Sequence, residues 1–130
     1  MRPIPVGAKG TFTLRVTPAH LANQFKDAML PPVFATPMMI TAMENAALNA
    51  IRGYLDPGES AVGTAVDVRH LAATPVGHEV TAEAEVTSVH ATKPVCQLMI
   101  KVTRQTGETV LEGEAWCYTF GRRVDRVSNP

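Results

Sequence analysis

The sequence predicts an α+β fold in which an antiparallel sheet wraps around one long central helix. Three observations predict this class: a long apolar helix signal over residues 37–52, four alternating strand patterns after it, and one strand pattern before it. Alternating strands give a sheet one buried and one solvated face, and the helix can cover the buried face. A length of 130 residues suits a single domain, which we place at 1–130.

The helix has clear start and stop signals. Thr36 is a preferred N-cap type, Pro37 suits the first helical position, and Gly53 fits the residue after the end. The polar positions of the helix form one narrow stripe: Thr41, Asn45, Asn49 and Arg52. Because the rest of its surface is mostly apolar, we expect burial on most sides.

The strands follow from period-two alternation. Residues 11–16 predict the first strand, and residues 17–32 read as irregular, with a possible short helix over 22–29. After a loop at 54–60, the strand predicted over 62–71 places five residues on one face: Val62, Thr64, Val66, Val68 and His70. A strand around 80–86 follows, and its apolar side alternates with glutamate and threonine.

The last two strands, 95–104 and 109–120, are expected to form a hairpin around Thr106-Gly107. A turn centred there sets Cys96 opposite Cys117 on the apolar side. Disulfides between direct cross-strand neighbours are usually strained, so we expect two buried free thiols.

Composition excludes several classes of protein. The formal net charge is zero, which argues against a nucleic-acid or membrane surface as the main partner. The longest uncharged stretch, 28–43, contains three prolines and is too short to span a bilayer. Two cysteines and an N-terminus without a signal-peptide pattern predict a cytoplasmic protein. The four histidines lack metal-ligand spacing, and no nucleophile elbow, phosphate-binding loop or dinucleotide fingerprint is present.

Three side chains suggest a hydrolytic site. Thr36 lies at the helix start, Glu44 two turns into the helix, and His70 on the strand that follows. A carboxylate in an apolar cleft can attack a thioester or activate water, and a histidine can move protons near neutral pH. Each also has an ordinary explanation: a cap for Thr36, a solvated helix edge for Glu44 and a hydrogen-bonded core residue for His70.

The segments VFATPMMITAMENAA, YLDPGESAVGTAVDVRHLAATPVG and VTAEAEVTSV carry a family resemblance. Over residues 10–120 the chain resembles the hotdog fold and, more narrowly, the fluoroacetyl-CoA thioesterase-like family. The spacing of Thr36, Glu44 and His70 matches the family's catalytic threonine, glutamate and histidine. The resemblance also implies a substrate-side role for Gly63, a homodimer, and no cofactor or metal, with coenzyme A as part of the substrate.

The segment before the helix departs from the family pattern. In fluoroacetate-specific members this segment supplies an aromatic lid over the acyl pocket; here it offers Phe25 and Phe34 at a different spacing. We therefore take both as candidate substrate-binding residues and leave the acyl group open. Candidate cations for the phosphates of coenzyme A are Lys93, Arg104, Arg122, Arg123 and Arg126.

The sequence thus predicts a homodimeric acyl-CoA thioesterase that hydrolyses a small acyl-CoA. Glu44 attacks the thioester or directs water, Thr36 positions Glu44, and His70 handles the proton. Two alternatives remain, an acyl-CoA hydratase or dehydratase of the same fold and a non-catalytic acyl-CoA binding module.

Overall fold

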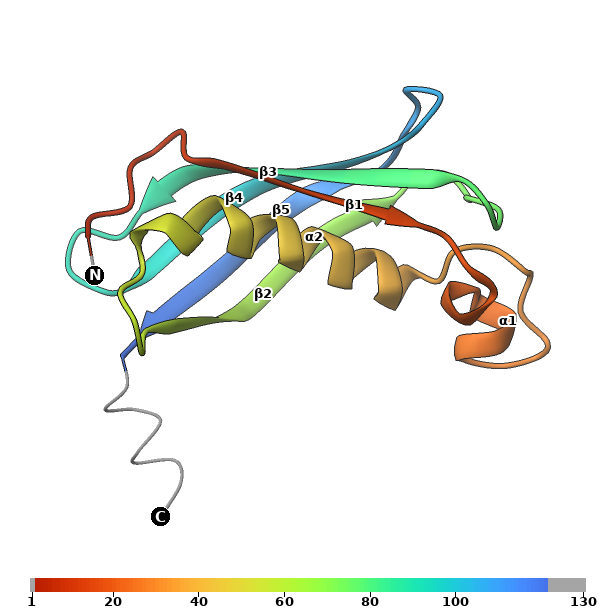
Figure 1. The fold of residues 1–130 in the computed structure, drawn as a ribbon, viewed down its shortest axis with the longest axis horizontal. Helices are drawn as coiled ribbons and strands as arrows, with labels where there is room; N and C mark the ends of the chain where they lie inside the picture. The colour runs from red at the N-terminus through yellow and green to blue at the C-terminus, as the bar shows by residue number, and fades with distance from the viewer. Residues whose placement is uncertain (1, 122–130) are drawn as a thin grey trace, which may run out of the picture.

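The computed structural model describes residues 2–121 and contains a five-stranded antiparallel sheet with one long helix along one face (Figure 1). The sheet order is β1-β3-β4-β5-β2, which leaves β1 and β2 as the two edges. The strands are β1 (Lys9–Arg15), β2 (Ser60–His70), β3 (Glu79–Val89), β4 (Val95–Arg104) and β5 (Thr109–Phe120). The predicted order of one strand, one long helix and four strands is confirmed.

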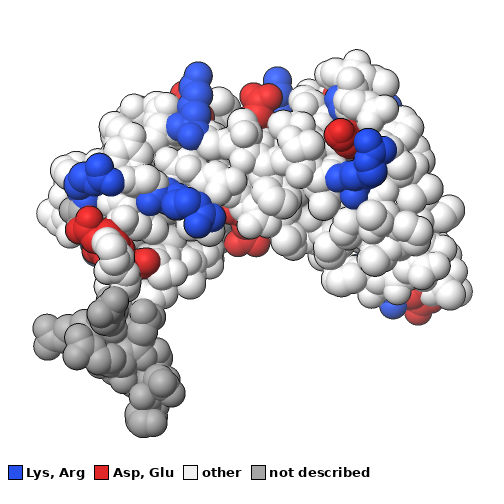
Figure 2. Space-filling model, in the orientation of Figure 1, with Lys and Arg blue, Asp and Glu red and all other residues white. Residues whose placement is uncertain are grey.

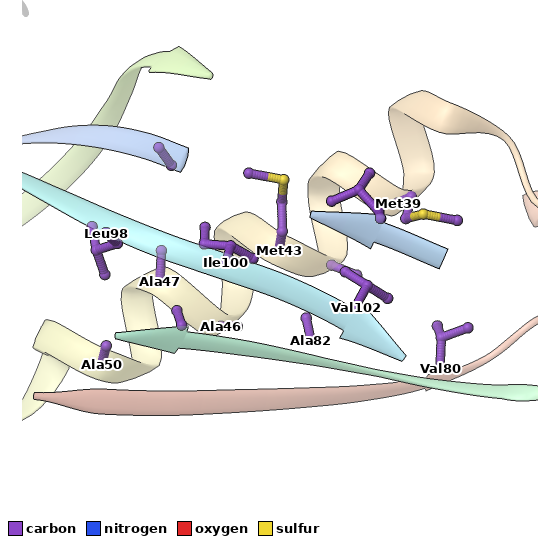
Figure 3. Packing of buried hydrophobic residues seen from close by; sticks show 14 of the residues in the cluster. Met39, Met43, Ala46, Ala47, Ala50, Val80, Ala82, Leu98, Ile100 and Val102 are labelled. Carbon is purple, nitrogen blue, oxygen red and sulfur yellow. The ribbon is translucent and has the colours of Figure 1, made fainter. Parts of the chain in front are cut away.

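The central helix α2 spans Thr36–Ile51. Its buried face carries two methionines, four alanines and one isoleucine, and these pack on the apolar side of the sheet (Figure 3). The polar stripe lies on the other side: Asn49 Nδ2 donates to Thr11 O at 2.8 Å, and Asn45 Nδ2 donates to Thr41 O at 3.0 Å. The polar stripe is where the sequence predicts it, but the predicted burial on most sides is wrong for one chain, because Met38, Ile40 and Leu48 are only half-buried.

Both predicted ends of α2 need correction. The N-cap is Ala35, and the Thr36 side chain makes no capping hydrogen bond because its hydroxyl has another partner. At the other end, α2 passes into a short 3-10 helix, η2 (Arg52–Tyr54), which contains Gly53. Gly53 does not adopt a positive φ, so it does not provide the glycine C-cap that we expected.

The segment before α2 is largely irregular. It contains a 3-10 turn, η1 (Pro18–His20), and one helical turn, α1 (Ala22–Phe25), in place of a helix over 22–29. An isolated antiparallel bridge joins Leu21 to Phe34 and closes the segment into a compact loop.

The predicted face of β2 is wrong in its first half. A register shift between Gly63 and Ala65 interrupts the pairing with β5, so Thr64 has no partner in the ladder. As a result Gly63 lies opposite Cys117 and Val66 opposite Ala115, whose side chains are buried under α2. Because one extra residue reverses the alternation, Gly63 takes the inward position that simple alternation gives to Val62 and Thr64.

The hairpin register is confirmed. Cys96 lies opposite Cys117, and both are buried free thiols. The apolar faces of β3 and β4 complete the core with a run of fully buried side chains: Val80, Val86, Leu98, Ile100 and Val102.

Candidate active site

Thr36 and His70 meet where the start of α2 faces the end of β2. Thr36 Oγ1 lies 2.7 Å from His70 Nδ1, which is a hydrogen-bond distance. When the hydroxyl donates, Nδ1 accepts and Nε2 carries the ring proton. Nε2 is buried and has no hydrogen-bond partner among residues 2–121. One ring nitrogen is thus held by Thr36, and the other has no hydrogen-bond partner in the described part of the chain.

Glu44 projects from the flank of α2 toward β2. A Cβ placed on Gly63 would lie 2.5 Å from Glu44 Oε2, so the carboxylate sits directly against the strand backbone. Within residues 2–121 this exposed carboxylate makes no hydrogen bond or salt bridge. A glycine inside a strand usually marks an irregular register or a close approach of another group. Gly63 shows both, since the register shifts beside it and the Glu44 carboxylate lies against its backbone.

A cavity of about 280 Å³ opens beside Glu44, between α2 and the edge of the sheet formed by β2 and β5. Its polar lining is confined to Thr41, Glu44 and Asn45. The remaining lining consists of Gly63 and small or aliphatic side chains: Ala47, Leu48, Ile51, Ala61, Val62, Val66, Ala115 and Cys117. A carboxylate at the mouth of an apolar hollow is the arrangement expected for an acyl substrate.

Cys117 belongs to this cavity, although the sequence analysis did not place it there. It lies opposite Gly63, and the pairing of β2 with β5 that brings it to the site was not predicted. A hydrogen bond with Cys96 raises the pKa of the Cys117 thiol, and burial and the negative charges of Cys96 and Glu44 raise it further. The thiol is therefore protonated near neutral pH and presents a small, nearly apolar surface.

The three predicted catalytic residues do not all meet within one chain. Thr36 contacts His70, but eight helical residues place Glu44 roughly 12 Å farther along the axis. On β2, Gly63 and His70 lie roughly 20 Å apart. One chain therefore presents two half-sites, the Thr36–His70 pair and the Glu44–Gly63 contact.

The two candidate aromatic residues lie outside the cavity lining. Phe34 is fully buried, its N–H donates to Thr74 O at 2.8 Å, and its ring makes an edge contact with His20 at a centroid distance of 6.1 Å. Phe25 lies at the end of α1 and is 50% exposed. Phe34 therefore supports the turn before α2, while Phe25 is free on the surface of one chain.

The candidate cations for coenzyme A are dispersed. Arg104 forms a salt bridge with Glu108 and donates to Ala73 O at 3.1 Å. Lys93 is exposed at a separate cavity of about 420 Å³ near the loop between β3 and β4. Arg122, Arg123 and Arg126 lie outside the described residues. On the face shown in Figure 2, basic and acidic side chains alternate without a large area of one sign.

A larger hollow, of about 610 Å³, lies on the outer face of the sheet, away from α2. Its lining includes both signs of charge, with Lys9, Lys101, Glu83 and Glu112 among its residues. Such alternation is typical of the solvated face of an antiparallel sheet. The smaller cavity at Glu44 is therefore the better candidate for the active site.

The described part of the chain has no group of three or more metal-binding side chains placed to hold an ion. Over the same residues, 2–121, the helices are too short or too polar to cross a bilayer.

Comparison with known proteins agrees with this geometry. Residues 16–118 match the model of the FlK family, described as fluoroacetyl-CoA-specific thioesterase. A curated fluoroacetyl-CoA thioesterase from Streptantibioticus cattleyicolor is 52% identical over 62 residues, which cover 48% of this chain and 45% of that protein. The aligned part thus spans a little under half the length of this relative.

Solved structures extend the match over the whole domain. A structure of the fluoroacetyl-CoA thioesterase FlK superposes with a TM-score of 0.86 at 29% identity, covering 97% of this chain and 95% of the other. A hypothetical protein of the thioesterase superfamily from Thermus thermophilus gives 0.89 at 26% identity, covering 98% and 92%. With the hotdog fold and the family-model match together, the chain belongs to the fluoroacetyl-CoA-specific thioesterase family.

Proposed function

We propose that this protein is an acyl-CoA thioesterase that hydrolyses a small acyl-CoA to the free acid and coenzyme A. The observation that carries the proposal is the unpaired Glu44 carboxylate at the mouth of an apolar cavity, in a chain of a thioesterase family. Coenzyme A enters as part of the substrate, and the reaction needs no metal or other cofactor. Location in the cytoplasm remains a prediction from the sequence.

In the proposed reaction the thioester carbonyl lies beside Glu44 and Gly63. Glu44 either attacks the carbonyl carbon or removes a proton from an attacking water. Collapse of the tetrahedral intermediate breaks the C–S bond. If Glu44 has attacked, this leaves a mixed anhydride on Glu44, which water hydrolyses to the free acid and the Glu44 carboxylate. On either route the proton that the water gives up passes through His70 Nε2 to the departing thiolate, so the imidazole ends the cycle neutral. Thr36 acts through its hydrogen bond to Nδ1, which fixes the orientation of the imidazole. This role replaces the predicted contact of Thr36 with Glu44.

The two half-sites fit a homodimer. β2 is a free edge of 11 residues with Val62 and Val66 48% and 42% exposed, and such an edge is prone to pair with another strand. Two copies of β2 can pair antiparallel about an axis between Val66 and Asp67. Gly63 of one protomer then lies opposite the partner's His70, which assembles Glu44, Thr36 and His70 into one site.

The activity is tested by free-thiol release from a panel of acyl-CoA esters, with wild type and Glu44→Gln in parallel. We expect release by wild type and a loss of at least about 100-fold in the variant, because the amide can neither attack nor accept a proton. Intact esters that bind without release would favour the binding module. Conversion of crotonyl-CoA without thiol release would favour the hydratase.

The shared site is tested by complementation. Glu44→Gln and His70→Ala are each expected to be inactive. When equal amounts of the two variants are refolded together, roughly half of the dimers contain one copy of each variant. In such a dimer one of the two sites has an intact Glu44 and an intact His70, so roughly a quarter of the wild-type activity should return. If no activity returns while the mixed dimers form, each site belongs to one chain.

A further inference from the structure

The cavity beside Glu44 carries information about the acyl group. From Glu44 the helix-side lining continues through Ala47 and Leu48 to Ile51, a distance of roughly 10 Å along α2. Its volume of about 280 Å³ is room for roughly nine groups of the size of a water molecule. A two-carbon acyl group would leave most of this space unfilled.

The chemistry of the lining is selective. Among residues 2–121 of one chain, no cationic side chain lines the cavity, and Glu44 is the only ionisable group there apart from the Cys117 thiol. The other two polar residues each use one donor on the helix backbone, since Thr41 Oγ1 donates to Pro37 O at 3.1 Å and Asn45 Nδ2 to Thr41 O at 3.0 Å. A carboxylate-bearing acyl group would enter beside a negative charge without a partner, at a large desolvation cost.

The same lining also disfavours the pantetheine arm of coenzyme A as the occupant. That arm carries two amides, and a buried amide without a hydrogen-bond partner costs free energy. Apart from Thr41, Glu44 and Asn45, the described lining offers aliphatic side chains, the backbone of Gly63 and the thiol of Cys117. An alkyl chain meets neither penalty and gains free energy with each methylene that it buries.

Resting on the thioesterase function proposed above, we infer that the enzyme acts on uncharged acyl-CoA esters of roughly four to eight carbons, and that Cys117 narrows the cavity on its strand side and thereby limits the acyl chain that fits. Cys117 lines the cavity on the strand side: it lies on β5 opposite Gly63 and is 8% exposed. Cys96 is its matched control, because it lies beside Cys117 on β4 but does not line this cavity.

The test compares kcat/KM for acetyl-, fluoroacetyl-, butyryl-, hexanoyl-, octanoyl- and succinyl-CoA. For wild type we expect a rise of roughly fourfold per added methylene up to an optimum beyond acetyl. Succinyl-CoA, which has the same number of acyl carbons as butyryl-CoA, should be at least about tenfold poorer. Cys117→Ala should move the optimum to longer chains and Cys117→Leu to shorter ones, whereas Cys96→Ala should leave the profile in place.

The outcomes separate this inference from the function on which it rests. Release from none of the esters overturns the thioesterase function, and the inference with it. Release that is fastest for fluoroacetyl- or acetyl-CoA overturns the chain-length inference alone. A chain-length profile that Cys117→Ala leaves unchanged also overturns the chain-length inference. Because Cys117→Ala removes only one side-chain atom, it still provides a test if Cys117→Leu does not fold.

Discussion

The two flanks of α2 face strands of the same sheet but are built differently. On the closed flank, β1 approaches the helix at Gly10, where a Cβ would overlap the backbone of Ala50 and lie 2.5 Å from Ala46 O. On the open flank, β2 approaches at Gly63, where a Cβ would meet only the end of the Glu44 side chain. Both glycines allow close approach, yet one brings two backbones together and the other makes room for a carboxylate.

This difference assigns separate tasks to the two flanks. α2 packs chiefly against β1 and β3, and only lightly against β2. The closed flank therefore holds the helix to the sheet, and the open flank keeps the cavity of about 280 Å³. A substitution on the closed flank should affect stability, and one on the open flank should affect activity.

The largest effect is expected for Gly10→Ala. Neither backbone can move without separating α2 from β1, so we expect a loss of about 3 kcal/mol or more in the free energy of unfolding, at the upper end of overpacking effects. Chemical denaturation measures it. Gly53→Ala is the matched control, because a Cβ there has no neighbour within 4 Å. Equal stability of the two variants would show that the flank is not closely packed.

Gly63→Ala should separate activity from stability. The new methyl group displaces a flexible side chain, so the protein should fold with a melting temperature near that of wild type. A displacement of the Glu44 carboxylate by about 1 Å can lower kcat/KM by about 100-fold. Thiol-release kinetics and thermal unfolding, again beside Gly53→Ala, measure the two quantities. Full activity in Gly63→Ala would argue against a reacting carboxylate at this position.

The sequence alone predicted the secondary-structure elements that form both flanks of α2. The apolar periodicity of residues 37–52 and the alternation in four strands predict the element order, and the turn at Thr106-Gly107 predicts the pairing of Cys96 with Cys117. These features depend on local patterns and on one short hairpin. The spacing of Thr36, Glu44 and His70, with the family resemblance, identified the candidate residues but not their contacts.

What could not be predicted depends on long-range pairing. The register shift after Gly63 turns this residue toward Glu44, and no local signal fixes the position of a bulge in an edge strand. The pairing of β2 with β5, which are separated in the sequence by β3 and β4, brings Cys117 into the cavity. Thr36 has the residue type of a cap, and only the arrival of His70 from β2 gives its hydroxyl a different partner.

Thr36→Val should have a smaller effect than Gly63→Ala. It removes the hydroxyl and keeps the side-chain shape, so the imidazole loses its orienting hydrogen bond and kcat should fall roughly tenfold to 100-fold. Thr36→Ser should restore most of the activity. Because Thr36 is not the N-cap, the stability should change by less than the roughly 1 kcal/mol that loss of a capping side chain costs. If Thr36→Val lost the full stability contribution of a capping side chain while kcat stayed unchanged, Thr36 would be a structural residue and not part of the active site.

The smallest effect is expected for the rate at which a thiol reagent labels the native protein. This rate tests whether solvent reaches Cys117 on the open flank. Cys117 lines the cavity, but its raised pKa keeps the thiol protonated near neutral pH, and the thiolate is the reactive form. The hydrogen bond with Cys117 lowers the pKa of Cys96, but this side chain is only 3% exposed, so burial shields it from a reagent. A thiol reagent at neutral pH should therefore label neither cysteine of the native protein quickly, and both after denaturation. Rapid native labelling that Cys117→Ala abolishes and Cys96→Ala does not would show that the strand side of the cavity is open to solvent. The open flank would then admit polar reagents as readily as alkyl chains, and the apolar lining would no longer explain the choice of acyl group.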